Sequence, residues 1–184
     1  MNSDVEKELP VNELQLELLI DRKEIEKKII SFSKQLEQDY EGKEIVLVMI
    51  MKGSFILVAD LIRHLHTPLH IEFLQCKSYG QRGVSKGDLE ITLLDTLDIE
   101  NNDVLLVDDI FDTGDTITEV INALERKNPA SLRTLVLLTK NVPRKRDYLP
   151  DYSLFNIEDH FVVGYGIDYK EYYRELPDIY KLSE

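Results

Sequence analysis

The sequence predicts an α/β fold in which a mainly parallel sheet is flanked by helices. Apolar runs of strand length recur at 45–51, 104–107 and 132–139, and continuous runs of this kind are typical of strands buried on both faces. Segments with apolar residues at helical spacing follow the first two runs, at 55–65 and 117–124. Alternation of strand and helix favours parallel strands joined by right-handed crossovers.

The segment before this alternating region predicts a short edge strand and a helix. Leucines and Ile20 mark the strand within 14–20. Asp21 and Glu24 then match a capping box, which marks the start of a helix. An apolar stripe follows at helical spacing, and the helix should end near Gly42. The stripe consists of Ile25, Ile29, Phe32 and Leu36.

Two further strands are expected at 71–78 and 89–97, and a last short strand at 161–164. The connection 79–88 contains three glycines, which predicts an antiparallel excursion with a mobile tip. No internal repeat or linker interrupts the chain. We therefore expect a single domain over residues 1–184.

Length and composition indicate the cellular compartment in which the protein is expected. A chain of 184 residues buries roughly 70% of its unfolded surface, which is enough for a core without covalent crosslinks. The single cysteine, Cys76, has no intramolecular disulfide partner. Residues 1–8 are acidic and lack the apolar segment of a signal peptide, and the longest apolar run, 45–51, is too short to span a bilayer. These features predict a cytoplasmic protein that does not associate with membranes.

The net charge of -13, with 35 acidic against 22 basic residues, disfavours nucleic acid as a partner. Proteins that bind nucleic acid usually present a basic face that displaces counterions. The charge also means that a polyanionic substrate would require backbone amides, a few fixed cations and bound metal at the site itself.

The most informative stretch is 104–117, where a buried strand leads into a helix through a short polar loop. Carboxylates at the strand end and hydroxyls beside a glycine indicate a hydroxyl or metal site next to an anion cradle. A simpler interpretation is a helix cap, because Thr116 and Glu119 alone would form a capping box. A cap, however, requires neither two upstream acids nor a glycine between threonines. The polar residues are Asp108, Asp109, Asp112, Thr113, Gly114, Asp115 and Thr116.

Polar or charged residues follow four of the predicted strands at their carboxyl ends, where ligands bind in doubly wound sheets. Lys52 and Gly53 follow 45–51, Asp108 and Asp109 follow 104–107, Lys140 follows 132–139, and Asp168 comes after 161–164. The chain lacks the motifs GxxxxGK[ST], GxGxxG and HExxH, as well as Cys/His metal clusters, which removes several common enzyme classes.

The polar loop resembles the phosphoribosyl diphosphate signature of the type I phosphoribosyltransferases, in which a hydrophobic strand and two acids precede Asp-Thr-Gly-x-Thr. The resemblance narrows to the hypoxanthine-guanine phosphoribosyltransferases through four other segments. Together they extend over about residues 45 to 175, roughly the length of one domain. The segments are Met-Lys-Gly-Ser at 51–54, Lys-Ser-Tyr-Gly at 77–80, Leu-Thr-Lys at 138–140 and Phe-Val-Val-Gly-Tyr-Gly-Ile-Asp-Tyr at 161–169.

This resemblance implies a type I phosphoribosyltransferase fold with a small hood region and a flexible lid loop. It also implies a Mg²⁺-dependent glycosyltransferase of purine salvage. Such an enzyme transfers the phosphoribosyl group of 5-phosphoribosyl 1-diphosphate to hypoxanthine or guanine, and forms IMP or GMP and pyrophosphate. A homodimer or homotetramer is expected.

The resemblance also assigns roles within the signature. The 5′-phosphate would lie in the loop 112–116, held by backbone N–H groups and by the hydroxyls of Thr113 and Thr116, as expected of a helix N-terminus. Asp112 would be the catalytic acid or base at purine N7. Asp115 would repel the phosphate, so its side chain is expected to point to solvent.

Other carboxylates and cations would surround the rest of the substrate. Asp108 and Asp109 are expected near the ribose hydroxyls and, with Asp168, as Mg²⁺ ligands. Adjacent strand residues point to opposite faces, so one acid of the pair could instead be structural. Lys52 and Gly53 would form a pyrophosphate loop with a cis peptide at the lysine, and Arg174 would add a second cation. Without the resemblance, Lys52 would equally suit a solvated turn.

The remaining assignments concern the base and the lid. Lys140, a pure donor, suits the O6 acceptor of hypoxanthine or guanine and not the 6-amino group of adenine. Phe161 would stack on the purine and Val162 would meet its edge through backbone groups, although a phenylalanine in the sheet core is a serious alternative. Ser78 and Tyr79 would begin the lid that excludes water.

Two alternatives remain from the sequence. The first is a phosphoribosyltransferase for another base, such as xanthine or a pyrimidine. The second is a regulator of the same fold that binds nucleic acid without catalysis, against which the acidic composition argues.

Overall fold

A computed structural model describes the chain except for residues 1–14, 79–88, 145–146 and 183–184. Its larger sheet has six strands in the order β4-β3-β2-β5-β6-β7. All neighbouring pairs are parallel except β3 and β4, which are antiparallel. The α/β prediction with a mainly parallel sheet is therefore confirmed. The strands are β2 (Ile45–Met51), β3 (Leu69–Ser78), β4 (Leu89–Thr92), β5 (Asp103–Phe111), β6 (Ser131–Lys140) and β7 (Tyr152–Ile157).

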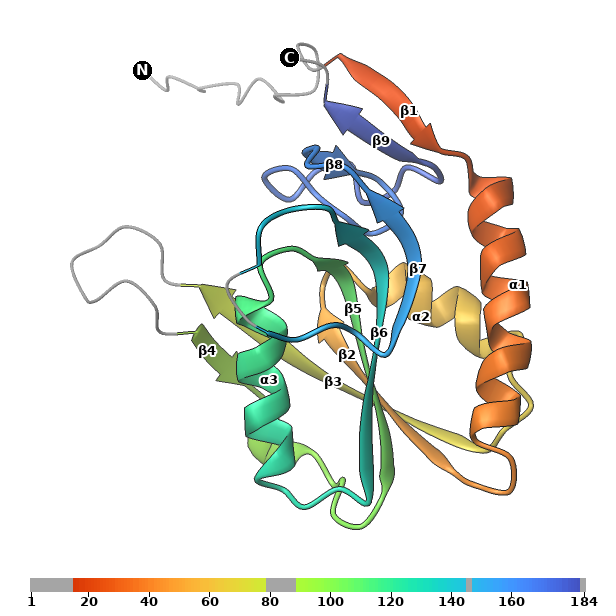
Figure 1. Ribbon diagram of the computed structural model, residues 1–184, viewed down its shortest axis with the longest axis vertical. Coiled ribbons are helices and arrows are strands. Elements are labelled where there is room, and N and C mark those ends of the chain that lie inside the picture. The colour runs from red at the N-terminus through yellow and green to blue at the C-terminus, as the bar shows by residue number, and fades with distance from the viewer. Residues whose placement is uncertain (1–14, 79–88, 145–146, 183–184) are drawn as a thin grey trace, which may run out of the picture.

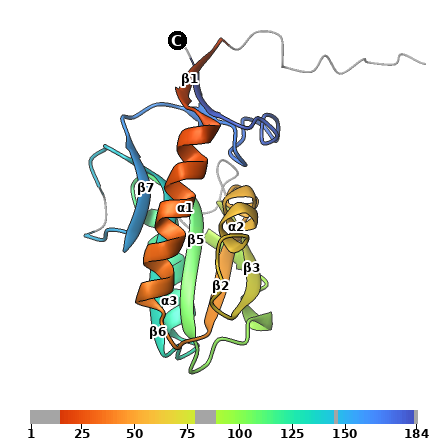
Figure 2. The same cartoon turned by 90° about the vertical axis from the view of Figure 1, so that its right-hand side faces the viewer.

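A smaller antiparallel sheet, with strand order β1-β9-β8, lies beyond the carboxyl end of the larger one (Figures 1 and 2). It corresponds to the expected hood. The strand β1 (Leu16–Ile20) forms its edge, as predicted, and pairs with β9 (Ile179–Leu182), while β8 (Val162–Val163) pairs with the other side of β9. Residues from the two ends of the described chain thus share one sheet.

Helices cover both faces of the larger sheet. The helices α1 (Arg22–Asp39) and α2 (Phe55–Ile62) pack on one face and α3 (Asp115–Glu125) on the other (Figures 1 and 2). The first turn of α1 is capped as predicted, because the Asp21 side chain accepts a hydrogen bond from the Lys23 N–H at 2.7 Å. No helix in the described ranges is both long and apolar enough to cross a membrane.

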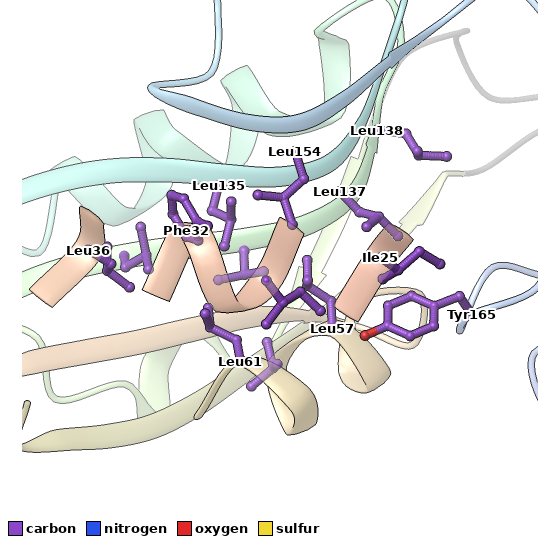
Figure 3. Close-up of a cluster of buried hydrophobic side chains, with 14 of the residues drawn as sticks. Ile25, Phe32, Leu36, Leu57, Leu61, Leu135, Leu137, Leu138, Leu154 and Tyr165 are labelled. Carbon is purple, nitrogen blue, oxygen red and sulfur yellow. The ribbon is translucent and has the colours of Figure 1, made fainter. Parts of the chain in front are cut away.

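The two layers of the core follow from strand alternation. Side chains of α1 and α2 pack against one set of sheet residues (Figure 3), and α3 packs against the set that points the other way. Tyr165, from the loop after β8, reaches the first layer and donates a hydrogen bond to Asp60 Oδ2 at 2.7 Å. This contact ties the hood to α2. The first layer includes Ile25, Phe32, Leu36, Leu57, Leu61, Leu47, Leu105 and Leu135, and the second Ile117, Val120, Leu124, Val46, Val48 and Leu106.

Several predicted boundaries were wrong. The expected strand 89–97 ends at Thr92, because Leu93 has a φ of 69° and a 3₁₀ helix, η2 (Leu94–Thr96), follows. The expected helix 55–65 ends at Ile62, and the last apolar run, 161–164, contributes only the two residues of β8, which join the hood and not the parallel sheet. The strands β7 and β9 were not predicted.

Candidate active site

A cavity of about 430 Å³ opens at the carboxyl ends of β2 and β5. The register explains why it forms there: β2 and β5 pair from Ile45 and Asp103 as far as Met49 and Val107, and past that point both strands continue without pairing to each other. Seven of the predicted site residues line the cavity, as the convergence of parallel strand ends requires. They are Lys52, Gly53, Asp108, Asp109, Thr116, Asp168 and Arg174.

Gly53 and Asp109 both line this cavity and lie against each other. A Cβ added at Gly53 would lie 1.7 Å from Asp109 Oδ2, so only glycine allows the loop after β2 to lie against this carboxylate. The Met51–Lys52 peptide bond in the same loop is cis, as the resemblance implies. The loop after β2 and Asp109 of β5 are therefore in direct contact.

Asp108 and Asp109 lie within β5, which continues to Phe111 instead of ending at Val107 as predicted. The Asp109 N–H donates to Asp108 Oδ1 at 2.9 Å, and the Ile110 N–H donates to Asp109 Oδ1 at 2.8 Å. Burial, followed by the neighbouring charge of Asp109, raises the pKa of Asp108. Burial also raises the pKa of Asp109. Both acids line the cavity despite being adjacent on a strand.

Two cations line the same cavity from loops that are far apart in the sequence. Lys52 Nζ lies 2.6 Å from Glu171 Oε2. Arg174 Nη2 lies 2.8 Å from Asp168 Oδ1 and 3.5 Å from the same Glu171 oxygen. The hydrogen bond from Lys52 is the main cause of the lowered pKa of Glu171. The cavity is therefore lined by a chain of ion pairs that links Lys52, Glu171, Arg174 and Asp168.

A divalent cation fits this donor set only with additional ligands. Within the described ranges, no group of three or more His, Cys, Asp or Glu side chains forms a ready metal site. Asp168 already accepts from Arg174 and, through Oδ2, from the Glu171 N–H at 2.8 Å. Mg²⁺ usually binds through one or two carboxylates together with water and substrate phosphate oxygens, so the carboxylates lining this cavity suit it.

The N-terminus of α3 forms a second part of the site. Gly114, with a φ of 87°, is the N-cap residue, so Thr116 lies within the first turn and not at the N-cap position. The alternative in which Thr116 begins a simple capping box is therefore wrong. Thr113 donates to Asp115 Oδ2 at 3.2 Å, and the Asp115 side chain is partly buried instead of pointing fully to solvent. The N–H groups of the first turn, beside two threonine hydroxyls, suit an anion, because a helix N-terminus carries partial positive charge.

Lys140, the last residue of β6, lies between two carboxylates. Its Nζ is 3.8 Å from Asp112 Oδ2 and 3.2 Å from Asp159 Oδ1, and its side chain is 12% exposed. Asp112 is 51% exposed. A fixed donor thus lies beside an accessible carboxylate, next to the loop that begins α3.

Phe161 is 52% exposed, so the alternative that it belongs to the sheet core is wrong. Its ring lies edge to face with that of Tyr169, with centroids 5.5 Å apart. Val162 is buried in β8. Ser78 is the last residue of β3, whereas Tyr79 and the expected lid loop lie outside the described residues.

Sequence reasoning missed three residues at the site. Cys76 lines the cavity, and burial together with the charge of Asp108 raises the pKa of its thiol to about 12. Asp159 contacts Lys140 and Glu171 contacts Lys52, from positions 19 and 119 residues away. No local pattern indicates such pairs. A carboxylate three residues before Arg174 was the one available signal for Glu171.

Comparisons with known proteins agree with this geometry. The family model described as "Phosphoribosyl transferase domain" matches residues 17–170. The chain is 41% identical over 170 residues to a hypoxanthine-guanine phosphoribosyltransferase of Aquifex aeolicus, covering 92% of this chain and 96% of that protein. It is 39% identical to one of Dictyostelium discoideum, covering 91% and 96%.

Solved structures give the same result. Hypoxanthine phosphoribosyltransferase from Trypanosoma cruzi, in complex with the product IMP, superposes with a TM-score of 0.84 at 37% identity, covering 92% of this chain and 95% of that one. A hypoxanthine-guanine phosphoribosyltransferase from Bacillus anthracis superposes with a TM-score of 0.84 at 35% identity, covering 93% and 100%.

Proposed function

The chain belongs to the hypoxanthine-guanine phosphoribosyltransferase family, and from this premise we propose that it transfers the phosphoribosyl group of 5-phosphoribosyl 1-diphosphate to hypoxanthine or guanine. The products are IMP or GMP and pyrophosphate, and the role is purine salvage. The observation that carries the proposal is the pair formed by Lys140 and Asp112, with Nζ and Oδ2 3.8 Å apart.

This pair suits a 6-oxopurine. The ammonium of Lys140 has donors but no acceptor, so it complements O6, and the Asp112 carboxylate complements a protonated N7. In the site an adenine amino group would face the Lys140 ammonium, a second donor that has no lone pair to accept a hydrogen bond. A polar site of this kind discriminates by up to about 10⁴ to 10⁵. Phe161, half exposed beside Tyr169, would cover the purine face.

The sugar phosphate would lie along the polar loop that opens α3. Its 5′-phosphate would accept hydrogen bonds from the N–H groups at 113–116 and from the hydroxyls of Thr113 and Thr116. The ribose hydroxyls would donate to Asp108 and Asp109, which line the neighbouring cavity. Lys52 and Arg174 would contact the diphosphate, the leaving group of the reaction.

Asp112 would act as the general acid or base at N7. Transfer breaks the bond from C1′ to the diphosphate oxygen and forms the bond from C1′ to N9, while the base loses a proton. A carboxylate next to N7 stabilises the positive charge that develops on the purine ring as N9 attacks. Asp112 is accessible to a ligand because half of its side chain is exposed.

Mg²⁺ is the proposed cofactor, and Asp108, Asp109 and Asp168 are its proposed protein ligands. When bound with the substrate, it would neutralise charge on the diphosphate, which otherwise meets several carboxylates in a chain of net charge -13. We further propose that residues 1–184 form one catalytic domain and that the protein acts in the cytoplasm.

A substrate panel tests this function. The full chain is assayed with 5-phosphoribosyl 1-diphosphate and Mg²⁺ against hypoxanthine, guanine, xanthine, adenine and uracil. We expect turnover of hypoxanthine or guanine and very low turnover of adenine. Activity on adenine without activity on hypoxanthine would contradict the role of Lys140, and tight RNA binding without turnover of any base would favour a regulator.

A further inference from the structure

One carboxylate in the cavity has no role in the proposed reaction, although it contacts both cations proposed for the diphosphate. Glu171 Oε2 lies 2.6 Å from Lys52 Nζ and 3.5 Å from Arg174 Nη2. A diphosphate that contacted both cations would approach the same donors as this oxygen. Glu171 and the diphosphate therefore compete for the same two partners.

The backbone fixes Glu171 at this position. Tyr169 and Tyr172 exchange two backbone hydrogen bonds of 3.0 and 3.1 Å, and the two residues between them, Lys170 and Glu171, have φ values of 51° and 71°. This pair of positive φ values is typical of a type I′ turn, which usually contains asparagine and glycine. Asp168 Oδ2 also accepts the Glu171 N–H at 2.8 Å. The turn thus directs a charged side chain where a small residue is the usual choice.

The side chain itself is free to leave. Glu171 is 65% exposed, so its carboxylate can rotate into water while the turn stays in place. Ion pairs with this exposure contribute little to stability because solvent screens them, and a highly charged diphosphate would replace them. Because the backbone does not move, the carboxylate returns to the cations when the diphosphate leaves.

Arg174 does not depend on Glu171 for its position. Its Nη1 donates to the Gly166 carbonyl at 2.8 Å, and its Nη2 contacts Asp168. The Lys52 ammonium, by contrast, donates to Glu171 Oε2 at 2.6 Å. Removing the negative charge of Glu171 would therefore leave one cation in place and release the other, without dismantling the site.

We propose that Glu171 is an internal counterion of the diphosphate subsite: its carboxylate neutralises Lys52 and Arg174, yields them to the diphosphate of the substrate, and displaces pyrophosphate after transfer. This inference rests on the proposed function for the identity of the ligand. It predicts that Glu171 weakens diphosphate binding, whereas a residue that merely supports the site would strengthen it.

The test compares Glu171→Gln with Glu175→Gln in the full chain. Glu175 is an exposed carboxylate in the same loop that lines a different cavity, beside α1 and α2, so the control makes the same change in net charge. For Glu171→Gln we expect the KM for 5-phosphoribosyl 1-diphosphate and the inhibition constant of pyrophosphate to fall about twofold to fivefold. The KM for hypoxanthine should stay unchanged, and 0.5 M salt should reduce the effect.

Calorimetric binding of Mg²⁺ pyrophosphate to the same proteins separates this inference from the proposed function. If no base is turned over but Glu171→Gln still tightens pyrophosphate binding, the counterion role of Glu171 is supported and the proposed reaction is wrong. If the wild type turns over hypoxanthine and Glu171→Gln leaves the KM for 5-phosphoribosyl 1-diphosphate and the inhibition constant of pyrophosphate unchanged or raises them, the proposed counterion role is wrong. An equal decrease in Glu175→Gln would also overturn it, because net charge alone would then explain the change.

Discussion

Gly53 lies so close to Asp109 that a Cβ at position 53 would come within 1.7 Å of the Asp109 carboxylate. The loop carrying Lys52 is therefore positioned directly by an acid of β5. Gly53→Ala must displace one of these groups, and a shift of about 1 Å at a reacting centre can lower turnover by about 100-fold. We expect kcat/KM for 5-phosphoribosyl 1-diphosphate to fall by at least about this factor.

Gly42→Ala is the control for this substitution. Gly42 also has a positive φ, 73°, but an added Cβ would meet nothing within 4 Å. It should cost about 1 kcal/mol of stability and leave the kinetic constants unchanged. Full activity in Gly53→Ala would show that the contact with Asp109 is not needed.

Asp112→Asn should lower turnover far more than substrate binding. The amide keeps the size of the side chain but cannot exchange a proton with N7, and general acid–base catalysis contributes typically about 10² to 10⁴ in rate. We expect kcat to fall within this range while the dissociation constant for 5-phosphoribosyl 1-diphosphate changes by less than about threefold, measured by calorimetry. The melting temperature should stay unchanged, because the side chain is half exposed. A lower melting temperature with unchanged kcat would indicate a structural aspartate.

Lys140→Gln should narrow the preference for 6-oxopurines. The glutamine amide can present a carbonyl to the amino group of adenine, which the ammonium cannot. We expect the ratio of kcat/KM for hypoxanthine over adenine to fall by at least about 100-fold. Lys34→Gln, on the exposed face of α1, should leave the ratio unchanged. An unchanged ratio in Lys140→Gln would assign specificity to other groups.

The sequence predicted the cavity because strand polarity decides where polar side chains meet. Lys52 and Asp109 are far apart along the chain, yet each lies at the carboxyl end of a buried parallel strand, so their proximity follows from the fold. The extension of β5 through the two acids was missed because apolar periodicity ends at Val107. β5 remains a strand there through its pairing with β6, which no local pattern reveals.

Ion pairs between distant loops were the features that the sequence could not predict. Glu171 meets Lys52 only because the hood places the loop after β8 against the loop after β2. β9 was missed for a related reason: four residues with a lysine among them, Ile179–Leu182, carry too little periodicity to indicate a strand. β9 forms because β1 and β8 pair with its two sides.

Removal of divalent cations should abolish activity without unfolding the protein. A chelator should lower turnover by at least about 100-fold, because a lost interaction of about 3 kcal/mol in the transition state corresponds to that factor. Added Mg²⁺ should restore it. The melting temperature should not change, since the described residues contain no ready cluster of metal ligands. Asp168→Asn should raise the Mg²⁺ concentration needed for half activity, and chelator-resistant turnover would exclude Mg²⁺ dependence.

The stability of the protein should decrease in acid partly through Asp103, far from the cavity. Asp103 Oδ1 lies 2.8 Å from Lys43 Nζ and also accepts a hydrogen bond from Ser131. The hydrogen bond from Lys43 is the main cause of the lowered pKa of Asp103 in the folded protein. A lowered folded pKa stabilises the protein above the unfolded pKa, about 3.9, and this stability is lost as pH falls through the folded value.

Asp103→Asn should therefore cost about 1 kcal/mol at pH 7, and the difference from wild type should shrink as the pH falls below about 4. Urea unfolding between pH 7 and pH 3 measures both quantities. Asp98→Asn, at an exposed position shortly before β5, is the control. Its stability should differ little from that of the wild type, because this substitution leaves the contact between Asp103 and Lys43 in place. A difference between Asp103→Asn and wild type that stays constant down to pH 3 would mean that the ionised carboxylate is not what stabilises this end of β5.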